Sequence, residues 1–278
     1  MTLRTFIDVP ELVDCIIDHL HEHPSALCTT ALLSKRWYPT SRYHLYTIPV
    51  ARSSKQTLLL FKTLEANPSL RISLRTLVVK QFCPSLLPRL LALTHTCPNL
   101  TSVVIQGGDD CAHTYQPPCT PLPSASRTIT SVTLVRYRFW KLSELVSLLR
   151  LFPGLSTLSL AHTSVVVEDS DDAQHALKGG LALSTLRFDG PTKSETQSGL
   201  FQVVDLGQLR HYYTHLYYGD VMSEQALSPI ISGSVERLTL KLTLGSLPGM
   251  WLFRLFKSLV STLHNQCMIY TRKFTCLS

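Results

Sequence analysis

The chain has 278 residues, of which 45% are hydrophobic and 16% are charged. This composition supports a sizeable buried core and excludes a chain that is disordered throughout. The formal net charge is +7, but the basic residues are scattered, which leaves nucleic-acid binding only weakly indicated.

The N-terminal segment does not have the pattern of a secretion signal. Asp8, Glu11 and Asp14 occur before any apolar stretch develops. No apolar run approaches the ~18 residues that a membrane span needs. We therefore expect an intracellular protein of the cytoplasm or nucleus, with no membrane partner. Its eight cysteines form no C-x-x-C pair and are expected to be reduced.

Three helices are predicted in the first fifty residues. Pro10 suits the first turn of the first helix, and Pro24 ends that helix. The second is expected at roughly 25–33 and the third at roughly 35–46, where Pro39 disturbs the start. The first helix carries an apolar stripe at helical spacing that is wide enough for two partners. This stripe consists of Leu12, Val13, Ile16, Ile17 and Leu20.

A short phrase of the form L-x-x-L-x-L recurs from about residue 68, after a predicted linker helix at 51–67. Its alternate apolar residues point inward from a short strand, and the intervening stretch returns over the other face, often as a helix. Successive central residues are 26, 29, 26, 28, 23 and 29 positions apart. These steps lie near the ~20–29-residue period of leucine-rich repeats. The central residues are Leu77, Val103, Val132, Leu158, Leu186, Leu209 in a weaker copy, and Leu238.

Helical stripes and loops alternate with these phrases. Apolar stripes predict helices around 86–91 and 142–149, the latter ended by Pro153. Polar stretches rich in Gly or Pro predict loops at 107–126, 190–199 and 245–249. The sequence therefore predicts an irregular α/β solenoid at 68–250. The tail at 251–278 has neither a repeat phrase nor a polar cap, so we expect it to be truncated or aberrant.

The N-terminal segment contains several spaced elements that agree with one known family. They are Val9-Pro10-Glu11-Leu12, then Ile16, Ile17 and Leu20, then Leu27, then Leu32-Leu33-Ser34-Lys35-Arg36-Trp37, and then Leu45-Tyr46. This series resembles the F-box, and the F-box-like proteins of fungi are particularly similar. The departures are Val9 and Leu33, where the family has Leu and Val. The resemblance implies a small three-helix F-box at 6–50, followed by the leucine-rich-repeat-like region.

The resemblance also implies a partner. An F-box docks on the adaptor subunit of an SCF-type (cullin-RING) ubiquitin ligase, and through it on a cullin. Docking contacts and the internal core of the module are not distinguished by sequence. Together they are expected to involve Val9, Pro10, Glu11, Leu12, Ile16, Leu20, Leu27, Leu32 and Trp37.

The remaining ~230 residues are expected to recruit a protein substrate through the concave side of the repeats. Side chains between the inward positions of each strand point out on this side. The candidates are Arg75, Ser102, Arg187 and Arg237, and their assignment depends on the strand register. Such a receptor acts by proximity, because it holds the target near the conjugating enzyme and performs no chemistry itself.

Motifs for catalysis, cofactors or metals do not support another function. The chain has no phosphate-binding loop, no G-x-S-x-G and no H-E-x-x-H. His19 with His23, the group Cys111, His113 and Cys119, and the acidic residues of 168–172 are weak metal candidates. We therefore expect no catalytic residues, metal or cofactor. Two alternatives stay open: a repeat scaffold without a ligase role, and a basic nucleic-acid-binding protein.

Overall fold

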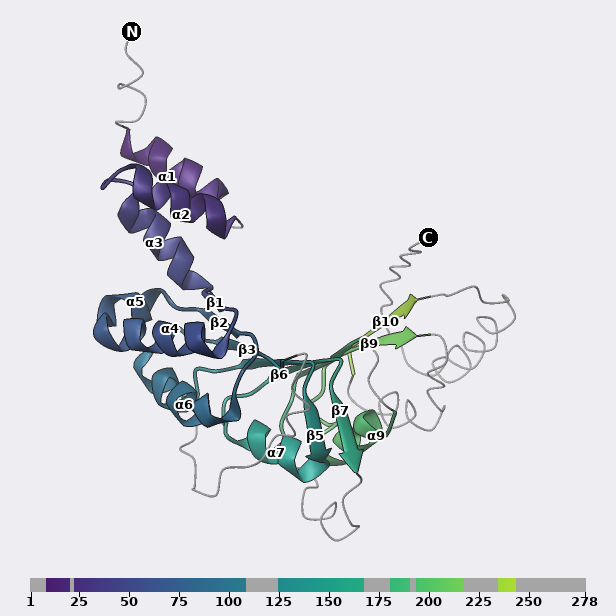
Figure 1. Cartoon of the computed structure of the whole chain (residues 1–278). Helices are drawn as coiled ribbons and strands as arrows, with labels where there is room; N and C mark the ends of the chain where they lie inside the picture. The colour runs from purple at the N-terminus through teal and green to yellow at the C-terminus, as the bar shows by residue number, and fades with distance from the viewer. Residues whose placement is uncertain are drawn as a thin grey trace.

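The computed structural model describes residues 9–20, 23–108, 125–167, 181–190, 194–217 and 235–243 (Figure 1). This part of the chain is mixed α/β, with one eight-stranded parallel sheet in the order β1-β2-β3-β4-β6-β8-β9-β10. The predicted mixture of helices and strands is therefore confirmed. The loops, acidic cluster and C-terminal tail predicted within 109–124, 168–180, 218–234 and 244–278 lie outside the described residues.

None of the helices in the described ranges combines the length and the apolarity that a bilayer crossing requires.

The first three helices are α1 (Pro10–His19), α2 (Pro24–Leu33) and α3 (Tyr38–Thr47). Helix α3 begins about three residues later than the sequence predicts, because Pro39 lies in its first turn, where a missing N–H is tolerated. The three helices enclose a small core of Val13, Ile17 and Leu27, with Leu20, Trp37 and Leu45 packed against it.

Polar contacts fix the helices to one another. The Thr40 hydroxyl donates to Asp14 over 2.8 Å, so α3 is joined to α1. A second link between these helices is the 2.8 Å contact between His44 and Asp18. The hydroxyls of Thr30 on α2 and Ser41 on α3 form a buried hydrogen bond of 3.0 Å. Buried polar groups that are paired in this way favour one helix arrangement over others.

The predicted linker segment contains more than a helix. Residues Val50–Ala51 form β1, which pairs in parallel with β2 and so begins the large sheet. Helix α4 (Ser54–Ala66) follows, and the Ser53 hydroxyl caps it by accepting from the Gln56 N–H. The short helix α5 (Pro68–Ser73) leads to β2. The segment therefore supplies the first strand of the sheet and a helix that packs on it, in addition to connecting two regions.

The strand register aligns the recurring phrases with one another. The central residues Leu77, Val103, Val132, Leu158, Leu186, Tyr212 and Leu238 form one row across the sheet. The sequence prediction for the sixth phrase was wrong by three residues, since Tyr212 occupies the central position and Leu209 the first one. The corrected steps are 26, 29, 26, 28, 26 and 26. The strands are β2 (Thr76–Val79), β3 (Ser102–Gln106), β4 (Ser131–Val135), β6 (Thr157–Ala161), β8 (Thr185–Asp189), β9 (His211–Tyr217) and β10 (Arg237–Thr243).

A regular hydrogen-bond ladder joins each phrase to the one before it. The Arg75 carbonyl accepts from the N–H groups of Thr101 and Ser102, over 3.0 and 3.2 Å. The same pairing recurs along the sheet as far as the Arg210 carbonyl, which accepts from Glu236 and Arg237. Side-chain hydroxyls reinforce it, because Ser156 and Ser184 also donate to the preceding phrase, over 3.2 and 3.1 Å. Each phrase is thereby held in register by its immediate neighbour.

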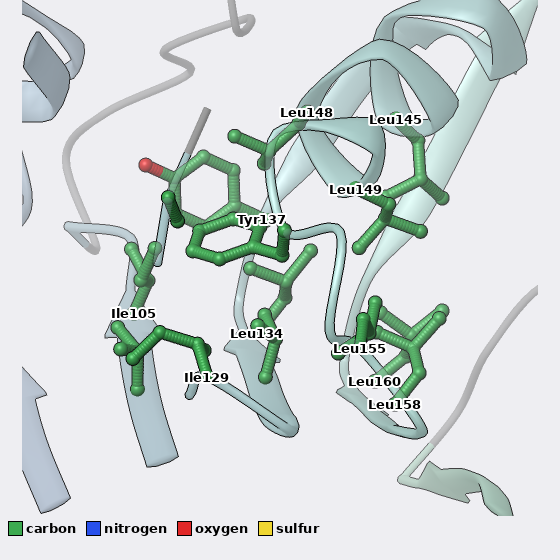
Figure 2. Close-up of a cluster of buried hydrophobic side chains, with 14 of the residues drawn as sticks. Ile105, Ile129, Leu134, Tyr137, Leu145, Leu148, Leu149, Leu155, Leu158 and Leu160 are labelled. Carbon is green, nitrogen blue, oxygen red and sulfur yellow. The ribbon is translucent and has the colours of Figure 1, made fainter. Parts of the chain in front are cut away.

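Helices cover one face of the sheet (Figure 1). They are α4, α6 (Leu87–Thr96), α7 (Leu142–Arg150) and α9 (Ser194–Val203), and a 3-10 turn, η2 (Pro84–Leu86), precedes α6. The stripes predicted for α6 and α7 are confirmed, because Leu87, Leu90 and Leu91 of α6 and the apolar residues of α7 are buried. Figure 2 shows the leucines of α7 facing those of β4 and β6. Full burial of each such leucine contributes about 1.5–3 kcal/mol.

The exit from each strand also repeats. Gln81, Arg136, His162 and Gly190 all have a positive φ, between 50° and 84°. Each lies two residues beyond the last inward-facing residue of its strand, so the backbone turns in the same way at four strand ends. After two of these turns the chain adds a second, two-stranded parallel sheet, formed by β5 (Arg138–Lys141) and β7 (Ser164–Val167).

Candidate functional site

Helix α1 has apolar residues on two sides. Val13 and Ile17 are 3% and 0% exposed and form the core of the three helices. Val9, Leu12 and Ile16 are 41%, 42% and 48% exposed. We call these three residues the α1 apolar face. Because they follow one another at spacings of three and four, they lie along one side of the helix. The wide stripe predicted from sequence thus divides into a buried half and an exposed half.

The nine residues predicted to bind an adaptor differ in their exposure to solvent. Val9, Glu11, Leu12, Ile16 and Leu32 are exposed, and Leu32 at the end of α2 is 88% exposed. Leu20 is half-buried against the core. The Pro10 side chain lies outside the described set.

Leu27 and Trp37 belong to the interior of the three-helix unit. Leu27 is 1% exposed, so of the two roles that the sequence leaves open, the structure places it in the core. Trp37 is half-buried and packs on the same core, with its indole Nε1 shielded from solvent. An effect of substituting either residue on partner binding would therefore act through the fold of the helices.

The second candidate surface is the side of the sheet that faces away from the helices, which we call the open face. Along each strand, buried residues alternate with partly exposed ones, as the patterns of β3, β4 and β6 show. The buried members join the core with the helices, and the others point to the open face. In β8 this alternation places Arg187 and Asp189 on the open face.

Arg187 is held in a fixed position on this face. Its guanidinium donates two hydrogen bonds to the Asp189 carboxylate, the longer of them 3.2 Å. It also lies over the ring of Tyr213 on β9, with 4.4 Å between the guanidinium carbon and the ring centroid. The hydrogen bonds to Asp189 raise the pKa of Arg187 above its ordinary value. The cation is therefore ordered by an anion and an aromatic ring while remaining exposed.

The four predicted substrate-binding residues occupy two regions. Arg187 and Arg237 lie near the β8–β10 end of the sheet and are exposed. Ser102 shares a row with Arg237 but lies on β3, several strands away. Arg75 is exposed and directly precedes β2. The structure therefore brings the four together in two pairs, since the Arg75 carbonyl accepts from the Ser102 N–H on the neighbouring strand.

Other residues of the open face were missed by the sequence analysis. Asp189 and Tyr213 surround Arg187, and Arg52 and Lys80 add two cations next to one another at the β1–β2 end. The i, i+2 spacing of Arg187 and Asp189 in a strand was a usable signal, because it places both side chains on one face. Tyr213 could not be placed, because the sixth phrase was assigned to the wrong register.

No family model matches this chain, and no curated protein sequence matches it. Within the described residues, no group of three or more His, Cys, Asp or Glu side chains is placed to hold a metal ion. The candidates Cys111, His113 and Cys119 and the acidic residues of 168–172 lie outside those residues.

Proposed function

We propose that the chain is the substrate-recognition subunit of an SCF-type ubiquitin ligase, with residues 6–50 as an F-box and 68–250 as a leucine-rich-repeat-like solenoid. The α1 apolar face carries the proposal: three apolar side chains stay exposed beside the row of Val13 and Ile17 that packs in the core. Exposed apolar residues of this kind mark surfaces that bind other proteins. The resemblance of 9–46 to the F-box identifies the partner as the ligase adaptor.

The proposed mechanism requires no catalytic group on this chain. The α1 apolar face binds the adaptor, which is joined to a cullin, and the open face binds a protein substrate. The substrate is then held close to the ubiquitin-conjugating enzyme, so its effective concentration rises and it becomes marked for degradation. The continuous ladder from β1 to β10 supports this arrangement, because it holds the strands that form the open face in one register.

Adaptor binding by the full chain tests this proposal. Leu12 and Ile16 are about half exposed, so their burial in a complex contributes about 1 kcal/mol each. Replacing both with Asp also leaves two charges against an apolar surface. We expect the Leu12→Asp, Ile16→Asp variant to weaken adaptor binding at least 30-fold, which corresponds to about 2 kcal/mol or more. Surface plasmon resonance with immobilised adaptor gives the affinity.

A matched control is available on α4 and α5. Leu59 and Ile72 are 53% and 61% exposed, and the Leu59→Asp, Ile72→Asp variant introduces the same charges away from α1. It should bind the adaptor like the wild type, and circular dichroism should show all three proteins to be equally folded. Absence of adaptor binding by the folded wild type contradicts the proposal and favours a repeat scaffold whose N-terminal helices are only its cap.

A further inference from the structure

The open face has an uneven distribution of charge. At the β1–β2 end, Arg52 and Lys80 directly follow the paired residues Ala51 and Val79, and continued alternation turns both toward this face. At the β8–β10 end it carries Arg187 and Arg237. Arg52, Lys80 and Arg237 have no acidic partner among the residues that the structure describes. Among the described residues at this surface, the acidic ones are Asp189 and Glu236, and each is already paired with an arginine. Both ends are therefore net basic.

The centre of the open face is uncharged. Strands β3, β4 and β6 present only Ser, Thr, Val, Gln and Ala there. The hydroxyls of Ser102, Ser131, Thr133, Thr157 and Ser159 make no hydrogen bond within the described residues. These side chains are short, so another polypeptide backbone can approach closely and find donors and acceptors.

We propose that the open face binds an extended acidic segment of a partner protein, which lies across the strands with carboxylates at both ends. Four strand-to-strand steps separate β2 from β8, and six separate β2 from β10. At about 4.8 Å per step these spans are about 19 and 29 Å. An extended chain advances about 3.3 Å per residue, so the two acidic groups are about six to nine residues apart.

The charge pattern favours a protein segment over a nucleic acid. A nucleic-acid strand carries a phosphate at every nucleotide, and binding grooves for it have cations along their whole length. The three central strands supply none. A polypeptide with acidic groups only at its ends matches both the basic ends and the hydroxyl-rich centre. The inference rests on the proposed function in one respect: the bound segment is taken to be the part of a ligase substrate that this chain recognises.

The test uses the full chain and fluorescein-labelled peptides in about 50 mM salt, where charge contacts are weakly screened. The probe has two Glu pairs separated by eight alternating Ser and Gly residues, which places the pairs about 30 Å apart when extended. One comparison peptide has the same composition with its four Glu residues contiguous, and another has Gln in place of Glu. Fluorescence anisotropy should show the spaced peptide binding at least fivefold more tightly than either.

Variants locate the binding surface. Lys80→Ser and Arg237→Ser each remove one cation from opposite ends, and each should weaken binding of the spaced peptide about fivefold, with a larger loss when combined. Lys62→Ser and Arg150→Ser remove the same charge from exposed positions on the helical side and should change binding less than twofold. Equal binding of the spaced and contiguous peptides, or an equal loss in the helical-side variants, overturns the inference.

A single-stranded oligothymidine of twelve nucleotides provides the remaining comparison. Tighter binding of this DNA than of the spaced peptide, lost in the Lys80→Ser and Arg237→Ser variants, also overturns the inference. Adaptor binding is measured on the same variants and should be unchanged, because both residues are far from α1. Peptide binding without adaptor binding would contradict the proposed ligase role alone, and the reverse result would contradict only this inference.

Discussion

Gly154 shows how one residue can be fixed by a close backbone approach. It follows Pro153 in the turn between α7 and β6, and a Cβ built on it would lie 2.0 Å from the Arg127 carbonyl oxygen. A carbonyl oxygen cannot rotate out of the way as a side chain can. Any larger residue at this position must therefore displace the backbone at Gly154 or at Arg127. The requirement arises from this contact and not from φ, since Gly154 does not have a positive φ.

We expect Gly154→Ala to lower the free energy of unfolding by about 1–3 kcal/mol, the usual cost of overpacking. Gly207→Ala is the matched control, because its Cβ would meet only the Asp205 carboxylate at 3.2 Å. That variant should change stability by less than about 0.5 kcal/mol, as surface substitutions usually do. Urea denaturation followed by circular dichroism measures both. A loss in the control as large as in Gly154→Ala would show that the backbone contact is not the cause.

At the scale of elements, strand β9 departs from the other strands. The last position of its L-x-x-L-x-L phrase holds Thr214, where β2, β3, β4, β6 and β8 have Val79, Ile105, Leu134, Leu160 and Phe188. The Thr214 and Tyr212 hydroxyls are buried and, within the described part of the chain, have no hydrogen-bond partner of good geometry. Burial also raises the pKa of Tyr212, an effect that the nearby Thr214 hydroxyl opposes in part. Thr214 therefore interrupts an otherwise apolar row, next to the buried hydroxyl of Tyr212.

Replacing Thr214 with Val should stabilise the protein. The change keeps the side-chain shape and removes a buried hydroxyl whose desolvation is not repaid, which is worth about 1 kcal/mol. The reverse type of change, Val79→Thr in β2, should destabilise it by a similar amount or more, because it buries a new unpaired hydroxyl. Thermal unfolding of the two variants beside the wild type measures both effects. A destabilised Thr214→Val protein would mean that the hydroxyl has a stabilising partner.

The elements also show which features could be predicted from sequence. Helices α6 and α7 were found because their leucines recur at helical spacing and all of them are buried. The sixth phrase was misplaced because Leu206 and Leu209 imitate its first spacing, while the true central residue is an aromatic. Register depends on pairing with neighbouring strands, which a single phrase does not encode. Arg187 and Arg237 were found, but Tyr213 required that register.

At the scale of the whole molecule, the described residues form two separate cores. Val13, Ile17 and Leu27 belong to the helical unit, and the sheet with its helices forms the other core. Leu27→Ala should therefore cost about 2–5 kcal/mol locally, as other buried leucines do. Hydrogen exchange should show faster exchange in α1–α3, with amides of β4 and β6 unchanged. Equal acceleration in those strands would show that the two cores unfold as one unit.

Because each phrase is bonded only to its immediate neighbours, the number of phrases sets the length of the open face in discrete increments. Excision of residues 102–130 would join Thr101 directly to Ser131, at equivalent points of two successive phrases. The register of all later strands could stay as it is, while Lys80 would lie about 4.8 Å closer to Arg187. Gain or loss of a whole phrase would thus lengthen or shorten the open face by one strand spacing. It would change the length of acidic segment that fits between the basic ends without altering any side chain that contacts it.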